Sequence, residues 1–405
     1  MSVSEVLAGV SLLLKCTVFY FAFVAVTGLL RKKRKCPSAL PTTRFAVVIA
    51  ARNEEAVIER LVKSLAAQDY PRELFDVFVI PNNCADDTAG AAFRAGAEIL
   101  LCEEPVRQKG DALRQAFEQL NGKGYDAYLV FDADNVVDRQ YLQKTNDAFC
   151  AGAQVVKGRQ MALNPRQSWV AGCYDLYFAG FDLLFNLPRA RGNLSAKLVG
   201  TGFAVRADVL EQMGGWNTST IAEDAEFAAQ CALAGIRVCW TPEAITYDEQ
   251  PCSFATSIYQ RKRWCSGVIQ VGRKMLPSLV HAPHSPLRRD ILLFLLTAQL
   301  QPVSVLLLCI SGLCTLSEAN FHSMELIGSP ALYWLGGVVF AVVLQRISRP
   351  ADRRNTWAAL LFPLFMASWV PLQVLALFRK TTDWQVIPHG ANKEIPVSYR
   401  GFFTW

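Results

Sequence analysis

The amino-acid sequence predicts an α/β domain with a mostly parallel sheet, preceded and followed by apolar helices long enough to cross a membrane. Residues 6–30 and 291–378 are strongly apolar, and residues 6–30 carry one charge, at Lys15. Between about 44 and 276, short apolar stretches typical of buried strands alternate with stretches of helical periodicity. Polar residues follow the predicted strands, at the sheet edge where open α/β sheets bind ligands.

The N-terminal apolar stretch predicts a membrane anchor. Five consecutive cations, residues 31–35, follow it directly, and such clusters stay on the cytoplasmic side of a membrane. A cleaved signal peptide carries its positive charges before the apolar stretch, where this chain has Glu5. We therefore expect residues 1–35 to form an uncleaved transmembrane anchor and basic stop, with the N-terminus outside the cytoplasm.

The C-terminal part of the chain predicts two or three more membrane segments within residues 281–378. The apolar stretches are residues 291–316, 331–344 and 356–378. Arginine is abundant between the second and third stretches, whereas residues 317–329 contain no Lys or Arg, which places the former loop inside and the latter outside. Pro363 and Pro371 interrupt the third stretch, so it spans the membrane, re-enters it or lies at its surface.

The middle of the chain predicts strands and helices in alternation. The predicted strands are residues 45–50, 76–80, 97–101 and 128–131, and the predicted helices are residues 54–68, 86–95 and 110–120. Asn53 is placed to cap the first helix. This alternation is typical of a parallel sheet covered on both faces, whose right-handed crossovers bring the strand ends to one edge. We therefore expect Asn53, Asn82 and Asp132 to lie near one another.

Two carboxylates stand one residue apart at the end of the fourth predicted strand, in the stretch VFDADN. Alternate residues of an extended chain point the same way, so Asp132 and Asp134 can share one cation, or bind one cation and a ribose. Carboxylate oxygens are the ligands that a hard cation such as Mg²⁺ prefers. A solvated turn of ordinary turn residues is the alternative that these residue types leave open.

Composition excludes several other kinds of protein. The twelve cysteines show no CxxC pair and no metal-ligand spacing, which is typical of free thiols in a reducing compartment. The net charge of +6 owes much to cations that border the apolar stretches, so it indicates a membrane rather than a nucleic acid as partner. The four histidines are too few and too scattered for a catalytic cluster.

Seven motifs over residues 44–270 resemble those of the family 2 glycosyltransferases, in particular the membrane-bound branch of cellulose, chitin and hyaluronan synthases. In chain order they are VVIAARNEE, PNNCADDT, RQKGDALRQAF, VFDADN, LVGTGFAVRADVL, IAEDAEF and QRKRW. The resemblance implies a GT-A catalytic domain, which is Rossmann-like with a mostly parallel sheet, over residues 36–280, with interfacial helices at its end. It also implies a UDP-sugar donor and a divalent cation.

The resemblance assigns one group of residues to the donor. The donor-binding residues are Arg52, Glu54, Asp86, Lys109, Asp132 and Arg263, and the ligands of the metal ion, Mg²⁺ or Mn²⁺, are Asp134 and Asp132. Glu54 would lie near the base and ribose, although the first turn of a helix also favours an acidic residue. Asn82 stands where the family commonly has an aspartate, so the expected uracil contact depends on Asp86. Lys109 either contacts the nucleotide or only begins a helix.

A second group is assigned to the acceptor. By resemblance, Asp224 is the general base, and the acceptor-binding residues are Thr201, Gly202, Glu223, Gln260 and Trp264. A carboxylate can take the acceptor's proton when partial burial raises its pKa and the hydroxyl lies within hydrogen-bond reach. Ala222 stands where the family has a threonine, and the alternative for Asp224 is a helix cap.

Residues 260–264 contain the QxxRW pattern that accompanies chain-synthesising members of the family. Arg263 would bind the diphosphate, and Trp264 would stack on a sugar ring of the acceptor. The alternative is a basic helix at the membrane surface, with Arg261, Lys262 and Arg263 facing lipid phosphates.

The sequence therefore predicts an inverting, metal-dependent glycosyltransferase, multi-pass in the cytoplasmic membrane, that extends a β-linked polysaccharide from a UDP-sugar. Gln299 and Gln301 would face an export passage, completed by the first helix, a second copy of the chain or an export partner. The alternatives are transfer of one sugar to a membrane lipid, and a non-catalytic protein that binds nucleotide sugar or polysaccharide. Residues 379–405, with Thr382 and Trp384, form either a lid over the donor or an unstructured tail.

Overall fold

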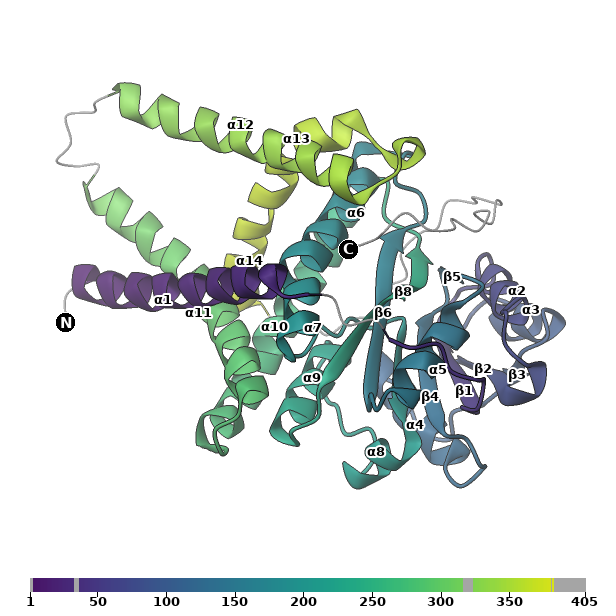
Figure 1. Ribbon diagram of the computed structural model, residues 1–405. Helices are drawn as coiled ribbons and strands as arrows, with labels where there is room; N and C mark the ends of the chain where they lie inside the picture. Colours follow the sequence, from purple (N-terminus) through teal and green to yellow (C-terminus); the bar gives the residue numbers. More distant parts are fainter. Residues whose placement is uncertain (1–2, 33–35, 316–322, 380, 382–405) are drawn as a thin grey trace.

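The computed structural model describes residues 3–32, 36–315, 323–379 and 381. It consists of a sheet covered by helices, and of long apolar helices gathered on one side of it (Figure 1). The lid predicted around Thr382 and Trp384 lies outside the described residues, as do three of the five cations that follow the first helix.

The described residues form one mixed sheet with the strand order β3-β2-β1-β4-β7-β6-β8-β5. The strands are β1 Phe45–Ala51, β2 Phe75–Pro81, β3 Glu98–Ile99, β4 Ala127–Asp132, β5 Asn135–Val137, β6 Val155–Ala162, β7 Phe203–Arg206 and β8 Val238–Asp248. The first four strands in this order are parallel, β7 runs antiparallel to both of its neighbours, and β8 is parallel to β6 but antiparallel to β5. The prediction of a mostly parallel α/β domain is confirmed.

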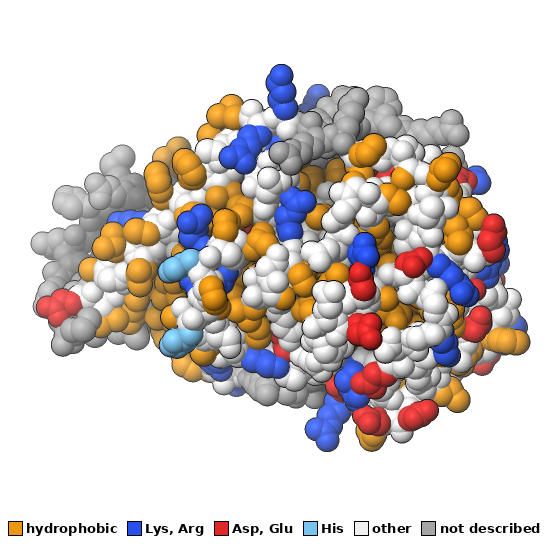
Figure 2. All heavy atoms as spheres, turned by 60° about the horizontal axis from the view of Figure 1, so that its bottom comes forward, with side chains coloured by type: hydrophobic (Ala, Val, Ile, Leu, Met, Phe, Trp, Pro, Cys, Tyr) orange, Lys and Arg blue, Asp and Glu red, His pale blue; other side chains and the backbone are white. Residues whose placement is uncertain are grey.

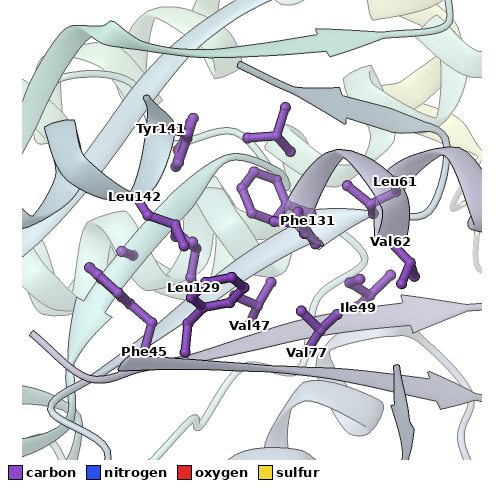
Figure 3. Close-up of a cluster of buried hydrophobic side chains, with 14 of the residues drawn as sticks. Phe45, Val47, Ile49, Leu61, Val62, Val77, Leu129, Phe131, Tyr141 and Leu142 are labelled. Carbon is purple, nitrogen blue, oxygen red and sulfur yellow. The ribbon is translucent and has the colours of Figure 1, made fainter. Parts of the chain in front are cut away.

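Helices cover both faces of this sheet. They are α2 Ile58–Ala66, α3 Thr88–Arg94, α4 Lys109–Leu120, α5 Tyr141–Cys150, α6 Trp169–Phe181, α7 Leu187–Gly192, α8 Ala207–Gln212, α9 Glu223–Leu233 and α10 Phe254–His281. Because alternate strand residues point to opposite faces, β1 contributes Phe45 and Val47 to the core under α2 and α5 (Figure 3), and Val48 to the core under α4 and α9. Burial on both faces explains why β1 is apolar throughout.

The first predicted helix begins later than expected, and the predicted cap is wrong. Asn53 adopts a φ of +56°, and its side-chain oxygen accepts a hydrogen bond from the Ala85 amide at 2.7 Å. The backbone from Glu54 to Val57 forms a turn, with 3.0 Å between the Val57 amide nitrogen and the Glu54 carbonyl oxygen. Asn53 therefore joins the loops that follow β1 and β2, which is why it cannot cap α2.

Four stretches in the described residues are long and apolar enough to cross a membrane. They are Glu5–Leu30, Pro286–Cys309, Pro330–Ser348 and Thr356–Phe378. The helices that contain them are α1 Val3–Leu30, α11 Pro286–Thr315, α12 Ser323–Ser348, α13 Thr356–Ala367 and α14 Trp369–Phe378. Hydrophobic side chains crowd the left side of Figure 2, where these helices lie, whereas most acidic side chains lie over the sheet domain on the right.

The last apolar stretch is two consecutive helices separated at Ser368. Pro371 has no amide hydrogen to donate to the carbonyl four residues earlier, and this weakens the helix at that point. The Arg261 guanidinium binds the carbonyl oxygen of Phe365 at 3.0 Å and the Ser368 hydroxyl at 2.6 Å. The break is therefore stabilised by a side chain from α10.

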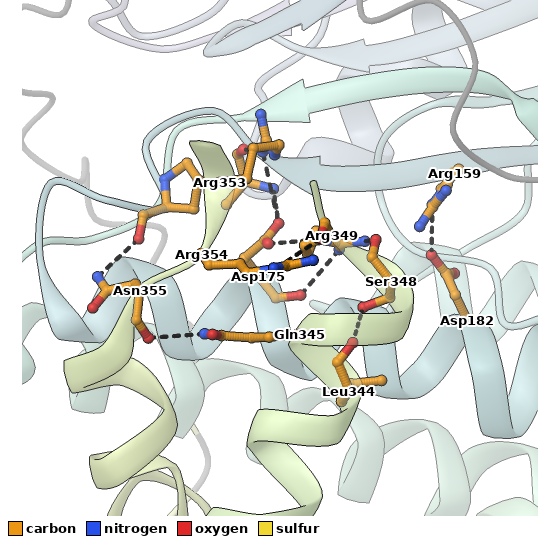
Figure 4. A network of polar contacts seen from close by, with 12 residues as sticks. Arg159, Asp175, Asp182, Leu344, Gln345, Ser348, Arg349, Arg353, Arg354 and Asn355 are labelled. Carbon is orange, nitrogen blue, oxygen red and sulfur yellow. Dashed lines mark hydrogen bonds and ion pairs between the residues drawn. The ribbon is translucent and has the colours of Figure 1, made fainter. Parts of the chain in front are cut away.

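A buried ionic network attaches the end of α12 to the sheet domain (Figure 4). Asp175 of α6 pairs with Arg349 at 2.5 Å and with Arg353 at 3.8 Å, and all three side chains are buried. Burial by itself would raise the pKa of Asp175, but the two arginines hold it below its ordinary value. Arg349 and Arg353, expected as cations of a cytoplasmic loop, are thus part of the contact between α12 and α6.

Candidate active site

A pocket of about 190 Å³ lies at the sheet edge formed by the ends of β4 and β8, where it meets the first turns of α4 and α9 and the helix α10. Ten residues singled out in the sequence line it: Glu54, Lys109, Asp132, Asp134, Thr201, Glu223, Asp224, Gln260, Arg263 and Trp264. These residues come from six separate parts of the chain. The fold therefore gathers most of the expected donor and acceptor residues around one space.

Asp132 is the last residue of β4, and Asp134 follows two positions later. The Asp132 amide donates to the Thr201 hydroxyl oxygen at 3.0 Å, which fixes the backbone where the strand ends. The Asp134 carboxylate accepts a hydrogen bond from the Asn135 side chain at 3.1 Å. Both residues are partly exposed and line the pocket at the sheet edge, with Asp134 in the turn between β4 and β5.

Lys109, at the start of α4, connects the carboxylate pair with the second acidic motif. Its ammonium forms an ion pair with Asp132, donates to the Gly200 carbonyl and lies 3.8 Å from the Glu223 carboxylate. Burial by itself would lower the pKa of Lys109, but attraction to Asp132 and Glu223 raises it above its ordinary value. The group is therefore a permanent positive charge inside the pocket.

Glu223 and Asp224 occupy the first turn of α9, whose N-cap is Ala222. Burial raises the pKa of Glu223 to about 7, against the opposing effect of Lys109. Burial also raises the pKa of Asp224, whose carboxylate accepts the Ala225 amide at 2.7 Å. Asp224 lies within the helix rather than at its cap, and a carboxylate with a raised pKa can accept a proton from a bound hydroxyl.

Two of the expected donor residues are used in the loops beside the pocket instead of lining it. The Arg52 Nε donates to the Asn82 side-chain oxygen at 3.1 Å. The Asp86 carboxylate accepts the amides of Glu55 at 3.1 Å and Thr88 at 3.2 Å. Arg52 and Asp86 thus hold together the loops after β1 and β2, and their expected contacts with the donor stay predictions.

Gly202, expected on the floor of the acceptor site, also lies outside the pocket lining. Its φ is +60°, its amide donates to the Val130 carbonyl at 2.8 Å, and a Cβ atom there would lie 2.9 Å from Thr246. The position requires glycine because the chain turns into β7 under tight packing. Thr201 does line the pocket, and its hydroxyl donates to the Asn135 side-chain oxygen.

The α10 wall of the pocket carries Arg263 and Trp264. The Trp264 ring meets Tyr174 edge to face at 5.9 Å between centroids and lies 6.1 Å from Trp369 of α14. The neighbouring Arg261 is buried, which contradicts the alternative in which it faces lipid phosphates. The pocket thus shares a wall with a helix of the last apolar stretch.

The glutamines of α11 differ in their surroundings. The Gln299 amide donates to the carbonyl oxygens of Val268 and Ile269 at 3.4 Å each and packs against Gly272. Gln299 therefore attaches α11 to α10, and its expected place on a passage stays a prediction. Gln301 is exposed.

Sequence reasoning missed five polar residues that line the pocket: Gln108, Gln160, Asp248, Glu249 and Gln250. Asp248 ends β8 and begins the stretch DEQ, the same signal of polar residues after a strand that identified Asp132. Burial together with Asp134 and Asp132 raises the pKa of Asp248 well above its ordinary value. Lys157 lies nearby in β6, where burial lowers its pKa to about 8 against attraction to Asp248.

The residues present fit a divalent cation that shares its ligands with a substrate. In the described parts of the chain, no group of three or more His, Cys, Asp or Glu side chains could hold a metal ion by itself. Asp132 and Asp134 nevertheless supply two carboxylates at the open side of a pocket. Mg²⁺ is commonly bound in this way, by one or two carboxylates together with substrate phosphates.

The fold is the GT-A-like fold of glycosyltransferases. The model of the family "Glycosyltransferase like family 2" matches residues 41–267, which is more than half of the chain. The chain therefore belongs to the family 2 glycosyltransferases. The family expected from the seven motifs and the expectation of an enzyme are both confirmed.

Three comparisons describe its relatives. A probable glycosyltransferase, YdaM, of Bacillus subtilis is 27% identical over 266 residues, covering 63% of this chain and 62% of the relative. The beta-monoglucosyldiacylglycerol synthase of a Nostoc species is 28% identical over 239 residues, covering 56% of this chain and 49% of the relative. Glucomannan 4-beta-mannosyltransferase 7 of Arabidopsis thaliana is 26% identical, covering 43% of this chain and 32% of the relative. The match thus spans less than two thirds of each relative's length.

A solved structure has the same fold over nearly the whole chain. It is the mannosyltransferase of Pyrobaculum calidifontis in complex with GDP-mannose and Mn²⁺. The TM-score is 0.66 at 18% identity, and the alignment covers 93% of this chain and 99% of the other.

Proposed function

We propose that the protein transfers a sugar with inversion, from a nucleotide-sugar donor to the hydroxyl of an acceptor that approaches from the membrane side. One observation carries the proposal: the carboxylate pair of Asp132 and Asp134 lines the same pocket as Asp224, and the Lys109 ammonium there pairs with Asp132. A donor diphosphate beside the first pair would leave its sugar pointing toward Asp224. An inverting displacement needs this order of leaving group, sugar and base.

The residues divide the chemistry between the acceptor hydroxyl and the donor diphosphate. Asp224 would accept the proton of the attacking hydroxyl, a step in which a positioned base typically contributes a factor of about 10² to 10⁴. Asp132 and Asp134 would hold Mg²⁺ or Mn²⁺, which when bound neutralises charge on the diphosphate. Arg263, on the α10 wall, would add a cation for the same phosphates.

We propose a membrane lipid as the first candidate acceptor. The Trp264 wall of the pocket contacts Trp369 in an apolar stretch, so a hydroxyl at the membrane surface would arrive beside Asp224. Gln299, expected on a polymer passage, donates to the backbone of α10. The lipid glycosyltransferase among the relatives supports the same choice.

Extension of a polysaccharide is the second candidate, and Trp264 favours it. An indole on the α10 wall of the pocket could stack on the terminal sugar of a growing chain while the nucleotide leaves. The glucomannan mannosyltransferases among the relatives support this possibility. The export partner, a homo-oligomer and the cytoplasmic orientation stay predictions, and a purely binding protein has no need of the base Asp224.

A donor panel tests both candidates. Membranes containing the protein would be incubated with UDP-sugars and, in parallel, GDP-sugars. The lipid fraction would be analysed by mass spectrometry, and the insoluble fraction for sensitivity to glucanase, chitinase and hyaluronidase. One sugar added to a lipid supports the first candidate, and an enzyme-sensitive polymer supports the second. Nucleotide binding without release from any donor would contradict both.

A further inference from the structure

Asn135 stands between the two acidic strand ends of the pocket. It is the first residue of β5, is 1% exposed, and pairs in antiparallel register with Asp248, the last residue of β8. Its neighbour in sequence is Asp134. Backbone pairing therefore places one carboxamide beside two carboxylates that are 114 residues apart, as their numbers 134 and 248 show.

The Asn135 side chain uses both of its polar atoms here. Its nitrogen donates to Asp134 at 3.1 Å and to Asp248 at 3.0 Å. Its oxygen accepts the Thr201 hydroxyl, and the Thr201 oxygen in turn accepts the Asp132 amide at 3.0 Å. One buried carboxamide thus contacts two acidic side chains directly and the third acidic residue through one hydroxyl.

This arrangement requires an amide rather than another polar group. A carboxamide offers two N–H donors and an acceptor in one plane, whereas a carboxylate offers acceptors only. Gln160 donates to the second oxygen of Asp248, so that carboxylate is held from two sides. Side chains that orient ligating carboxylates typically change metal affinity or activity by about 10-fold to 100-fold when they are removed.

We propose that Asn135 is a positioning residue that orients Asp134 and Asp248 and, through Thr201, Asp132, so that the cation and the donor diphosphate meet carboxylates already in place. The inference rests on the proposed function, and it adds Asp248 to the acidic groups of the site. Asn135 itself touches neither the donor nor the cation. Its loss would act on their binding.

The test uses the full chain purified in detergent, with Asn135→Leu compared with the unchanged protein. Two quantities are measured: the Mn²⁺ concentration that half-saturates the rise in melting temperature caused by UDP, and the Mn²⁺ concentration that half-saturates sugar transfer. Asn135→Leu is expected to raise both by about 10-fold to 100-fold. The kcat at saturating Mn²⁺ should fall much less.

Asn146→Leu is the matched control. Asn146 is equally buried, and its side chain binds the Leu40 carbonyl at 3.0 Å and the Thr43 amide at 3.1 Å, away from the pocket lining. This variant should lower the melting temperature of the ligand-free protein while leaving the half-saturating Mn²⁺ concentration unchanged. Loss of fold stability is thereby separated from loss of cation binding.

The outcomes separate the inference from the proposed function. A folded Asn135→Leu protein with the original Mn²⁺ dependence overturns the inference. If Asn135→Leu does not fold, Thr201→Val decides, because it removes the hydroxyl that links Asn135 to Asp132. An unchanged Mn²⁺ dependence overturns the inference, and a raised half-saturating Mn²⁺ concentration with an unchanged KM for the acceptor supports it. An unchanged protein whose melting temperature responds to no mixture of UDP and Mn²⁺ refutes the proposed function itself.

Discussion

Replacing Asp224 with asparagine tests the chemistry of the site most directly. The amide is nearly the same size as the carboxylate, and its oxygen can still accept the Ala225 amide, which lies 2.7 Å from the carboxylate in the structure. The fold of α9 and the shape of the pocket should therefore persist. What disappears is the ability to take a proton from the acceptor hydroxyl.

The expected loss follows from the role of Asp224. Removing a general base typically costs a factor of about 10² to 10⁴ in rate. At 1.36 kcal/mol for each factor of ten, this corresponds to about 2.7 to 5.4 kcal/mol of lost transition-state stabilisation. Donor binding should change little, because the carboxylates of Asp132 and Asp134 are unchanged.

The assay measures transfer from the active donor together with the affinity for UDP and Mn²⁺. Asp208→Asn is the control, since it makes the same change in an exposed ion pair with Arg206. An exposed pair contributes about 0 to 1 kcal/mol, so this control should keep its activity. Weak UDP binding by Asp224→Asn, with turnover close to that of the unchanged protein, would refute the assignment of Asp224 as the base.

Four further predictions concern other parts of the molecule. Asp134→Ala, like EDTA added to the unchanged protein, should abolish turnover, and full activity in EDTA would contradict a metal-dependent reaction. Because burial raises the pKa of Glu223 to about 7, above the ordinary value of 4.5, its contribution to stability should be complete at low pH and lost as the pH rises through about 7. Between pH 4.5 and 8 the melting temperature should therefore fall less steeply for Glu223→Gln than for the unchanged protein. An equal pH dependence of the two melting temperatures would count against the raised pKa. Trp264→Ala should shorten or abolish any polymer in product analysis while hydrolysis of the donor remains measurable, and an unchanged product would remove Trp264 from the acceptor site. Arg349→Met should lower the free energy of unfolding by about 3 to 5 kcal/mol, because it leaves the buried Asp175 carboxylate without its main partner, and Asp175→Asn added to it should restore part of that loss in thermal unfolding.

Much of the fold could be predicted from local sequence patterns. All four strands of the parallel half were located to within two residues at both ends. In β1, β2 and β4 the reason is burial on both faces, which makes these strands largely apolar. The apolar stretches were equally clear, since a membrane span needs about 20 apolar residues in succession. Helix starts were less predictable: α2 begins at Ile58 because Asn53 bonds across to the next loop.

The site was predictable where a motif stands at the end of a strand in the parallel half. Asp132 follows an apolar run directly, and the acidic pair of α9 stands at a helix start, so both could be recognised locally. Asp248 carries a similar signal, but nothing in its surrounding sequence states which strand lies beside β8. The antiparallel pairing of β5 with β8 decides that Asp248 shares Asn135 with Asp134.

The sequence by itself determined the class of fold, the apolar stretches and ten of the residues that line the pocket. Strand burial, helix periodicity, the length of a membrane span and the motifs are each visible in residues that are neighbours in the sequence. The tertiary structure decided which groups face one another. Arg349 lies in an arginine-rich stretch that is typical of a cytoplasmic loop, yet its side chain is buried against Asp175, 174 residues away. Gln299 is a polar residue within an apolar stretch, a pattern typical of a membrane passage, and its side chain donates to the backbone of α10. In each case the partner comes from a distant element, and the free energy of pairing a buried polar group, rather than any local pattern, determines where the side chain lies.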